Sequence, residues 1–345
     1  MLSAIVIVGP ETREHEESSA LTSGPSADFS PALTQVLQET PLVCVEALGR
    51  SVAGRTIEEV RRAGIDVISL LGNVSGVSRS SMDPATNIVP CSTEDAWRRT
   101  KQELITWKQH CVDAAIIIRA GAYVDFDLRD ALQSHRDQCR AVTRVFDQQG
   151  PLDIWIIDPS RFDADPEFLT IVQEDEPAHY LVNGYVNRLE SPRDLRRLIV
   201  DGLTSRCGLR PQGTEIRPGV WVDDAAQIHR DARIVAPAFI GRGTRIAEQC
   251  LITRCSNVES NCQVDYGTVV EDSSILSNSY VGIGLDLSHA IVDGSNLINL
   301  ERDVTLEIAD PCIIRQNKPV REETNFQSPV GFALGNGQFA QAEEA

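Results

Sequence analysis

The stretch from Ile216 to Val281 decides the fold, and divided into sixes it reads IRPGVW, VDDAAQ, IHRDAR, IVAPAF, IGRGTR, IAEQCL, ITRCSN, VESNCQ, VDYGTV, VEDSSI, LSNSYV. Each hexad opens on an aliphatic residue, and most carry a small residue four positions later, such as Ala238, Thr244 and Cys250. A helix repeats one face every three, four and seven residues, so it does not explain a period of six. Short strands joined by sharp corners do, and the pattern predicts a solenoid whose aliphatic residues, Ile216 to Leu276, point inward.

The whole chain has 345 residues, which suggests two domains, and 42% of them are hydrophobic, enough to bury real cores. The formal charge is −18, with 50 acidic and 32 basic residues. A field of this sign repels phosphate backbones, so nucleic acid is not an expected partner. Lysine is rare: Lys101, Lys108 and Lys318 are the three in the chain.

The start of the chain lacks the basic residues of a signal peptide, and no apolar run reaches the length of a membrane span. We therefore expect a cytoplasmic protein without a membrane partner. The nine cysteines are expected to be free thiols in a reducing compartment. Cys250 and Cys262 occupy the small-residue position of the hexad, which favours packing over metal binding.

The first 210 residues alternate between strand and helix patterns, and several strands are continuous apolar runs. This is typical of a mainly parallel sheet covered on both faces, so the expected fold class is α/β. Ser191 and Pro192 read as the cap and first residue of the last helix. The expected strands are 4–8, 66–71, 113–119, 141–146 and 152–157, and the expected helices are 55–63, 93–110 and 127–136.

Three segments carry a family resemblance: PLVCVEALGRSVAGRTIEEVRRAGIDVISLL from Pro41, AIIIRAGAYVDFDLRDALQSHRDQCRAVTRVF from Ala115, and GYVNRLESPRDLRRLIVDGL from Gly184. They resemble the sugar nucleotidyltransferases, which join a sugar 1-phosphate to a nucleoside triphosphate. The hexads resemble the left-handed parallel β-helix that many members carry. The resemblance implies a Rossmann-like, nucleotidyltransferase-type mixed-sheet domain over residues 1–210, a left-handed β-helix over 211–312 and a tail over 313–345.

The chain departs from the family where the chemistry would lie. Bringing two polyphosphate groups together calls for a glycine-rich loop, a lysine, and aspartates that hold Mg²⁺. The expected loop here contains Pro10, Glu11 and Glu14, and Thr40 stands at the lysine position. Ala122 and Arg188 stand at the two aspartate positions. The residues that match the remains of this nucleotide or sugar-phosphate pocket are Gly9, Thr12, Arg13, Gly121, Asp125 and Arg188.

These departures predict a nucleotidyltransferase-like protein of sugar-nucleotide or polysaccharide metabolism that has no catalytic set and no metal or other cofactor. We expect an assembly or regulatory role, with a second copy or an active paralogue bound through the β-helix, and a nucleotide or sugar phosphate as pocket ligand. The first alternative is an active, Mg²⁺-dependent nucleotidyltransferase, with Asp125 and Asp127 as relocated ligands.

The second alternative is a hexapeptide-repeat acyltransferase that uses a histidine as general base. Of the two histidines in the hexad region, His229 directly follows an inward position and is expected at the surface. His289 lies where the repeat becomes irregular, because the in-phase residues Gly282, Ser288 and Gly294 are no longer aliphatic. An irregular segment of this kind predicts a loop, and loops often carry functional residues.

Overall fold

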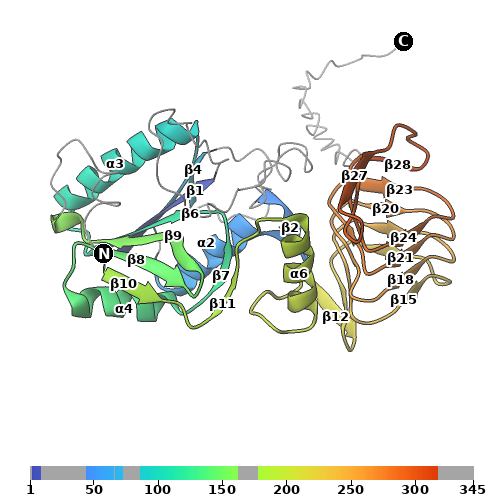
Figure 1. Cartoon of the computed structure of the whole chain (residues 1–345), viewed down its shortest axis with the longest axis horizontal. Helices are drawn as coiled ribbons and strands as arrows, with labels where there is room; N and C mark the ends of the chain where they lie inside the picture. The colour runs from blue at the N-terminus through green and yellow to red at the C-terminus, as the bar shows by residue number, and fades with distance from the viewer. Residues whose placement is uncertain (1, 9–43, 66, 73–85, 162–177, 318–345) are drawn as a thin grey trace, which may run out of the picture.

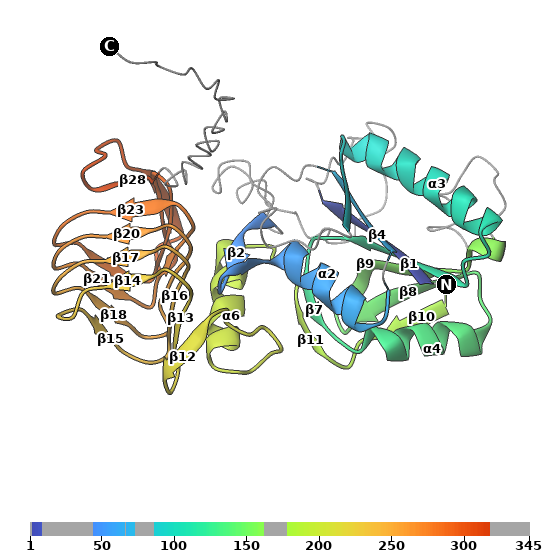
Figure 2. The same cartoon turned by 180° about the vertical axis from the view of Figure 1, so that it is seen from behind.

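The computed structural model describes residues 2–8, 44–65, 67–72, 86–161 and 178–317. The chain forms a mixed α/β unit and a stack of short parallel strands, which lie on opposite sides of helix α6 (Pro192–Leu203; Figures 1 and 2). The predicted α/β class with parallel sheets is confirmed at this level. No helix within the described residues is long and apolar enough to span a membrane.

The α/β unit is built on one seven-stranded sheet with the order β10-β8-β9-β6-β1-β4-β5. Its strands are β1 (Leu2–Val8), β4 (Val67–Gly72), β5 (Thr86–Pro90), β6 (Ala114–Arg119), β8 (Val142–Asp147), β9 (Gly150–Ile157) and β10 (Ala178–Leu181). Neighbouring strands are parallel except β9, which runs antiparallel to both β6 and β8. Two small antiparallel pairs join them: β2 (Glu46–Ala47) with β3 (Arg50–Ser51), and β7 (Tyr123–Asp125) with β11 (Tyr185–Asn187).

Helices cover both faces of this sheet, as the continuous apolar strands predict. Helices α2 (Val52–Arg62) and α4 (Leu128–Gln138) bury Ile57 and Leu132 against one face, while α3 (Thr93–Gln109) buries Leu104 against the other (Figure 1). A short 3-10 helix, η3 (Pro159–Arg161), follows β9. Ser191 caps α6 and Pro192 is its first residue, which confirms the prediction for this helix.

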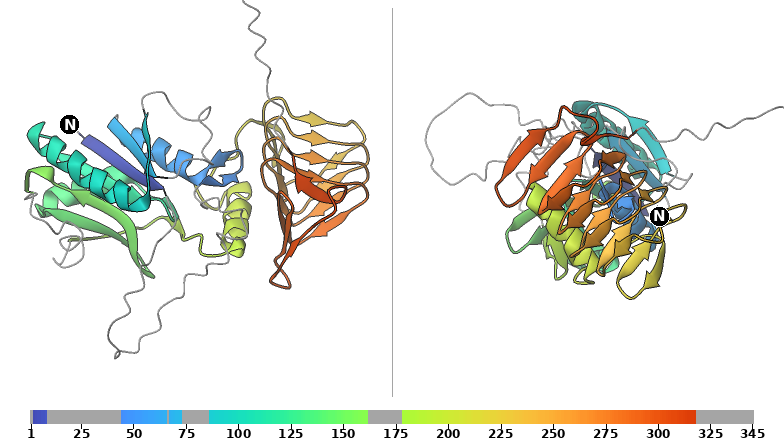
Figure 3. Two further views of the ribbon diagram at one scale, coloured as in Figure 1. Left: turned by 90° about the horizontal axis from the view of Figure 1, so that it is seen from above. Right: turned by 90° about the vertical axis from the view of Figure 1, so that its right-hand side faces the viewer.

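The C-terminal half is a stack of three sheets, and except at the two ends of the stack the chain visits them in turn, one short strand at a time (Figure 3). Stack sheet 1 contains β12 (Thr214–Arg217), β13 (Val220–Val222), β16 (Ala238–Ile240), β19 (Asn257–Val258), β22 (Ser274–Ile275), β25 (Ala290–Asp293), β26 (Asn296–Asn299) and β27 (Val304–Glu307). Stack sheet 2 contains β14 (Gln227–Ile228), β17 (Arg245–Ile246), β20 (Gln263–Val264), β23 (Ser279–Val281) and β28 (Ile314–Gln316). Stack sheet 3 contains β15 (Arg233–Ile234), β18 (Leu251–Thr253), β21 (Val269–Glu271) and β24 (Asp286–Ser288).

Where the small residue of a hexad is a threonine or a cysteine, it has a second role besides fitting the corner. Thr268 Oγ1 donates to the carbonyl of Gly282 at 2.6 Å, and Cys262 Sγ lies 3.1 Å from the carbonyl of Leu276. In return, Cys262 N donates to Thr244 Oγ1 at 3.1 Å. These bonds run from one layer to the next, so hydroxyls and thiols satisfy corner backbone groups that the short strands leave unpaired.

Two details of the predicted hexad phase are wrong. Ile216 is 52% exposed, because it lies on β12, which runs antiparallel to β13 at the start of the stack. Leu276 is not the last inward residue, because Val258 is in register with Ile275, 17 residues later instead of 18. The corner at Asp272 is one residue shorter than the corner in the layer before it.

The apparent loss of the repeat after residue 281 follows from this shift. The inward residues continue one position earlier, at Val281 and Leu287, where both are buried in the core of the stack. His289 therefore lies at a regular corner between β24 and β25 and not in an irregular loop. The last described strand, β28, lies beyond residue 312 and pairs with β23.

Helix α6 joins the two halves of the molecule. It buries Leu195 and Leu198 in one apolar cluster with Phe239, Leu276 and Ile291 of stack sheet 1, and Leu48 from the β2–β3 turn belongs to the same cluster. The central strands of stack sheet 1 are therefore covered by α6 and the β2–β3 turn, while the end strands β12 and β27 stay exposed, and Leu276 faces α6.

Candidate functional site

A hollow that is open to solvent lies beyond the carboxyl end of β6. Gly121 and Ala122, in the turn between β6 and β7, line it together with Arg188, which directly follows β11. The carboxyl ends of strands in an open α/β sheet are the usual place for a ligand. The structure thus brings together three positions that the sequence assigned to one pocket.

Arg188 is held at this pocket by fixed acceptors. Its Nη2 donates to Asp147 Oδ1 at 2.6 Å and to the carbonyl of Gly150 at 3.1 Å, while its Nε donates to Asp147 Oδ2 at 3.2 Å. Burial by itself would raise the pKa of Asp147, but the Arg188 hydrogen bonds and the backbone amides of Gln149 and Gly150 outweigh it and lower that pKa. The guanidinium and the carboxylate therefore form a lasting ion pair over ordinary pH.

The second cation of the pocket is neutralised in the same way. Arg119, at the end of β6, donates through Nε to Asp153 Oδ2 at 2.9 Å. Arg144 also approaches Asp153, at 3.5 Å, and stacks over the Trp155 ring. Each of the two arginines that line the hollow is thus paired with a carboxylate, and Glu190 adds a further negative charge to the lining.

The aspartates considered as relocated metal ligands both hold backbone amides instead. Asp125 accepts from Gly208 N at 2.6 Å, and a side chain at residue 208 would collide with the Asp125 carboxylate. Asp127 caps α4 by accepting from Arg129 N at 2.9 Å. Neither lines the hollow beside Arg188.

The other predicted pocket residues, Gly9, Thr12, Arg13 and the loop positions Pro10, Glu11, Glu14 and Thr40, lie outside the described residues. Within the described ranges, no three His, Cys, Asp or Glu side chains gather as a metal-binding group. At the two positions where the resemblance puts metal ligands, the chain offers the Ala122 methyl and the Arg188 cation. These two side chains do not fit Mg²⁺, which takes oxygen ligands.

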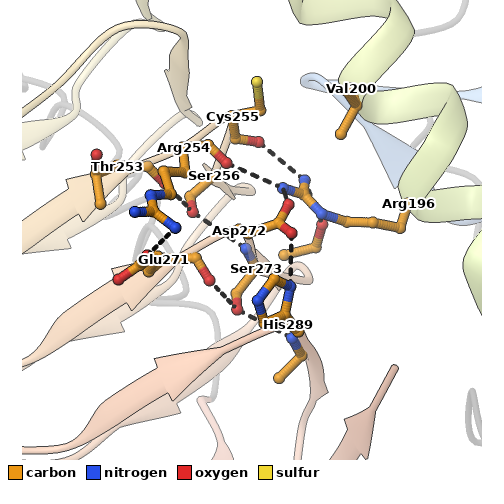
Figure 4. A network of polar contacts seen from close by, with 12 residues as sticks. Arg196, Val200, Thr253, Arg254, Cys255, Ser256, Glu271, Asp272, Ser273 and His289 are labelled. Atoms are coloured by element: carbon orange, nitrogen blue, oxygen red, sulfur yellow. Dashed lines mark hydrogen bonds and ion pairs between the residues drawn. The ribbon is translucent and has the colours of Figure 1, made fainter. Parts of the chain in front are cut away.

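A second polar cluster lies where the corners of the stack meet α6 (Figure 4). His289 Nδ1 is 2.7 Å from Asp272 Oδ2, and the His289 side chain is 45% exposed. Both residues have a positive φ, 49° for His289 and 43° for Asp272, so each forms a tight corner, one directly above the other. Asp272 thus orients the imidazole through Nδ1 and leaves its Nε2 for another partner.

Asp272 has a second partner on the other half of the molecule. Arg196, on α6, donates to Asp272 Oδ1 at 2.8 Å and to the carbonyl of Cys255 at 2.9 Å (Figure 4). Burial lowers the pKa of Arg196, and the bond to Asp272 opposes that effect. One carboxylate therefore connects the histidine of the stack to the helix of the α/β unit. His229, the other histidine of the stack, is 41% exposed with its Nδ1 3.7 Å from Asp231.

The members of these clusters that sequence reasoning missed include Asp147, Asp272 and Arg196. The sequence signal for Asp272 was partial: it precedes His289 by 17 residues, close to one layer of the stack, but a regular spacing of 18 residues does not pair the two. No comparable signal links Asp147 to Arg188, which are 41 residues apart on elements joined only by the fold.

No protein-family model matches this chain. A search of curated proteins likewise finds no relative with significant sequence similarity.

Proposed function

We propose that the chain is a sugar-nucleotidyltransferase-like protein that does not transfer nucleotides and instead serves assembly or regulation in sugar-nucleotide or polysaccharide metabolism. In this proposal the α/β unit is the nucleotidyltransferase-type domain and the stack is a left-handed parallel β-helix. The 18-residue and 17-residue spacing between stacked strands supports a triangular coil of three hexads. Its left-handedness rests on the family resemblance of the hexads.

The observation that carries the lack of catalysis is the Arg188–Asp147 ion pair beside Ala122. A guanidinium anchored by four acceptor contacts cannot turn away from the position that the family gives to a metal ligand. The guanidinium offers Mg²⁺ no oxygen ligand, and because Asp147 already matches its charge, it offers little attraction to a phosphate. The pocket is therefore better suited to binding a sugar phosphate or nucleotide weakly than to bringing two polyphosphates together.

The test is pyrophosphate release from nucleoside triphosphates and a panel of sugar 1-phosphates with Mg²⁺. We expect no turnover above the enzyme-free rate, and calorimetry should show triphosphate binding that is weak and not strengthened by Mg²⁺. Pyrophosphate formation at an ordinary turnover rate, about 1 per second or more, would support the active-enzyme alternative instead.

Acyl transfer is a second candidate function, favoured by the His289–Asp272 pair. With Nδ1 bound to Asp272, Nε2 can take the proton from an acceptor hydroxyl or amine, whose oxygen or nitrogen then attacks an acyl thioester. The proton passes on to the thiolate that leaves. Thiol release from acyl-coenzyme A, with sugars or amino sugars as acceptors, tests this candidate. His289→Asn should reduce the rate about a hundredfold or more, and no thiol release by the natural protein would reject acyl transfer.

A further inference from the structure

The three outward faces of the stack differ in what covers them. The central strands of stack sheet 1 are covered by α6 and the β2–β3 turn. Stack sheet 2 presents Gln227, Arg245 and Gln263 outward, beside Tyr280 with Arg315 stacked on its ring. Stack sheet 3 lies on the side of the stack away from α6 in both views (Figures 1 and 2).

Stack sheet 3 carries an outward column with a symmetric pattern. Arg233, Leu251, Val269 and Asp286 are in register on its four strands. The next residue on each strand points into the core of the stack, so these four side chains point away from it. The column therefore reads cation, aliphatic, aliphatic, anion from one end of the sheet to the other.

We propose that a second copy of this chain docks on stack sheet 3, so that the two copies of this sheet lie face to face. The two-fold axis lies between the two sheets, parallel to the strands and midway between β18 and β21. That rotation reverses the column, so Arg233 faces Asp286 of the second copy and Leu251 faces Val269 of the second copy. This pairing of residues does not depend on the distance between strands, because a two-fold axis through the middle of a column always places its first residue opposite its last. A column that complements itself under a half-turn is what a two-fold interface requires along its centre.

Two further observations fit this partner. Arg233 and Asp286 are exposed, and neither forms an ion pair with another residue in the described part of its own chain. Large apolar side chains also border the sheet: Val235 follows β15 and is 42% exposed, while Tyr266 and Ile283, on the corners before β21 and β24, are 45% and 65% exposed. Such residues would extend the contact beyond the column itself.

The proposed dimer is weak. Four strands at about 4.8 Å spacing make a narrow face, well under the roughly 800 Å² per partner of a standard interface. We therefore expect dissociation in the micromolar range. The proposal rests on the assembly role given above, but its test measures mass and not pyrophosphate, so either can fail without the other.

The experiment is a charge swap followed by sedimentation over a concentration series. Arg233→Glu and Asp286→Arg each place like charges together twice in the dimer, so each should raise the dimer dissociation constant about tenfold or more. The double variant restores opposite charges and should return to within about threefold of the natural protein. Arg245→Glu, an exposed arginine on stack sheet 2, is the matched control and should leave the dissociation constant unchanged.

Circular dichroism of each variant is the control that checks whether the fold is kept. Single reversals that leave a dimer intact, or a double variant that stays dissociated, would overturn the proposed face. A natural protein that remains monomeric up to about 100 µM would overturn the dimer itself and leave this face to residues 318–345 or to another protein.

Discussion

Glu259 and Gly49 are joined across the junction of the two halves: Glu259 Oε2 accepts a hydrogen bond from Gly49 N at 2.8 Å. Glu259 Oε1 accepts from Leu48 N, also at 2.8 Å, and from Asn257 Nδ2 at 2.6 Å. The Glu259 side chain is fully buried. Both turn residues have a positive φ, 58° for Leu48 and 87° for Gly49, which aims two successive amides at one carboxylate.

This link predicts a pH dependence of stability. Burial, and then the charge of Glu46, raises the pKa of Glu259 from 4.5 to about 7, although the hydrogen bonds act against it. Because the folded-state pKa is the higher one, folding favours the neutral acid. The stabilising contribution is complete below pH 4.5 and is lost as the pH rises through about 7. The gap between the two pKa values corresponds to about 3 kcal/mol at most.

Denaturation of the natural protein and of Glu259→Gln at pH 5 and pH 8 measures this contribution. The natural protein should lose more of its free energy of unfolding between these pH values than the variant, by up to about 3 kcal/mol. Asp293, whose pKa burial raises to about 6, titrates in the same interval but cancels in the comparison. Glu248→Gln, at an exposed glutamate of the stack, is the control; equal pH slopes in all three proteins would contradict the prediction.

A second prediction concerns Arg196, which is 6% exposed and bridges α6 to Asp272 and to the Cys255 carbonyl. Arg196→Met should destabilise the protein by about 2–4 kcal/mol, because Asp272 then keeps only its His289 contact and the Cys255 carbonyl loses the Arg196 donor. Chemical denaturation measures the loss. Arg197→Met is the matched control on the same helix: its side chain is 61% exposed and pairs with Asp194, so we expect less than about 1 kcal/mol. Equal losses in the two variants would refute the bridging role.

A third prediction concerns Ile240, which is fully buried in the core of the stack. Ile240→Asp should unfold the stack, because an unpaired buried carboxylate costs several kcal/mol or must take up a proton. Thermal melts followed by circular dichroism decide the matter. Arg245→Asp introduces the same side chain at an outward position of the next strand and should melt close to the natural protein. A melt of Ile240→Asp that matches it would mean that the inward face is assigned wrongly.

The fold could be predicted from the sequence where one type of residue repeats at a fixed spacing for a single physical reason. Inward aliphatic residues such as Ile240 and Val264 reveal the period of six, because the narrow core accepts little else. The shortened corner at Asp272 stayed hidden, because Ile275 and Leu276 are both aliphatic and either can serve as the inward residue. Packing of α6 on Leu276 settles the choice, and that contact joins segments about 80 residues apart.

The candidate sites could be predicted only in part, because they too depend on contacts between segments that are distant in the sequence. Arg188 could be recognised as a cation among pocket residues, but its partner Asp147 is the last residue of β8, 41 residues earlier. Glu259 reads in the sequence as an ordinary surface glutamate of a hexad. Its burial depends on amides more than 200 residues earlier in the chain. Long-range polar contacts of this kind leave no local pattern.

The last prediction is that rebuilding the two missing aspartates does not restore nucleotidyl transfer. In Ala122→Asp/Arg188→Asp, the new carboxylate at residue 188 would replace the guanidinium that now lies 2.6 Å from Asp147. The pocket would gain oxygen ligands beside Asp147, so we expect Mg²⁺ binding to appear in calorimetry. The natural protein and Arg188→Asp/Asp147→Arg, which exchanges the ion pair, are the controls without a rebuilt metal site.

Turnover should still be absent in the rebuilt variant, because a metal is one of several charges that the reaction needs. The loop that the family resemblance assigns to the triphosphate contains Pro10, which has no amide proton, and the anions Glu11 and Glu14, and the resemblance puts Thr40 in place of a lysine. Losing one electrostatic contact to the transition state costs about a hundredfold or more in rate, and these losses act together. Pyrophosphate assays should therefore detect no release above the enzyme-free rate, even when Mg²⁺ is bound. Turnover in the rebuilt variant but not in the natural protein would show that the loop is sufficient as it stands, and that Ala122 and Arg188 alone silence the site.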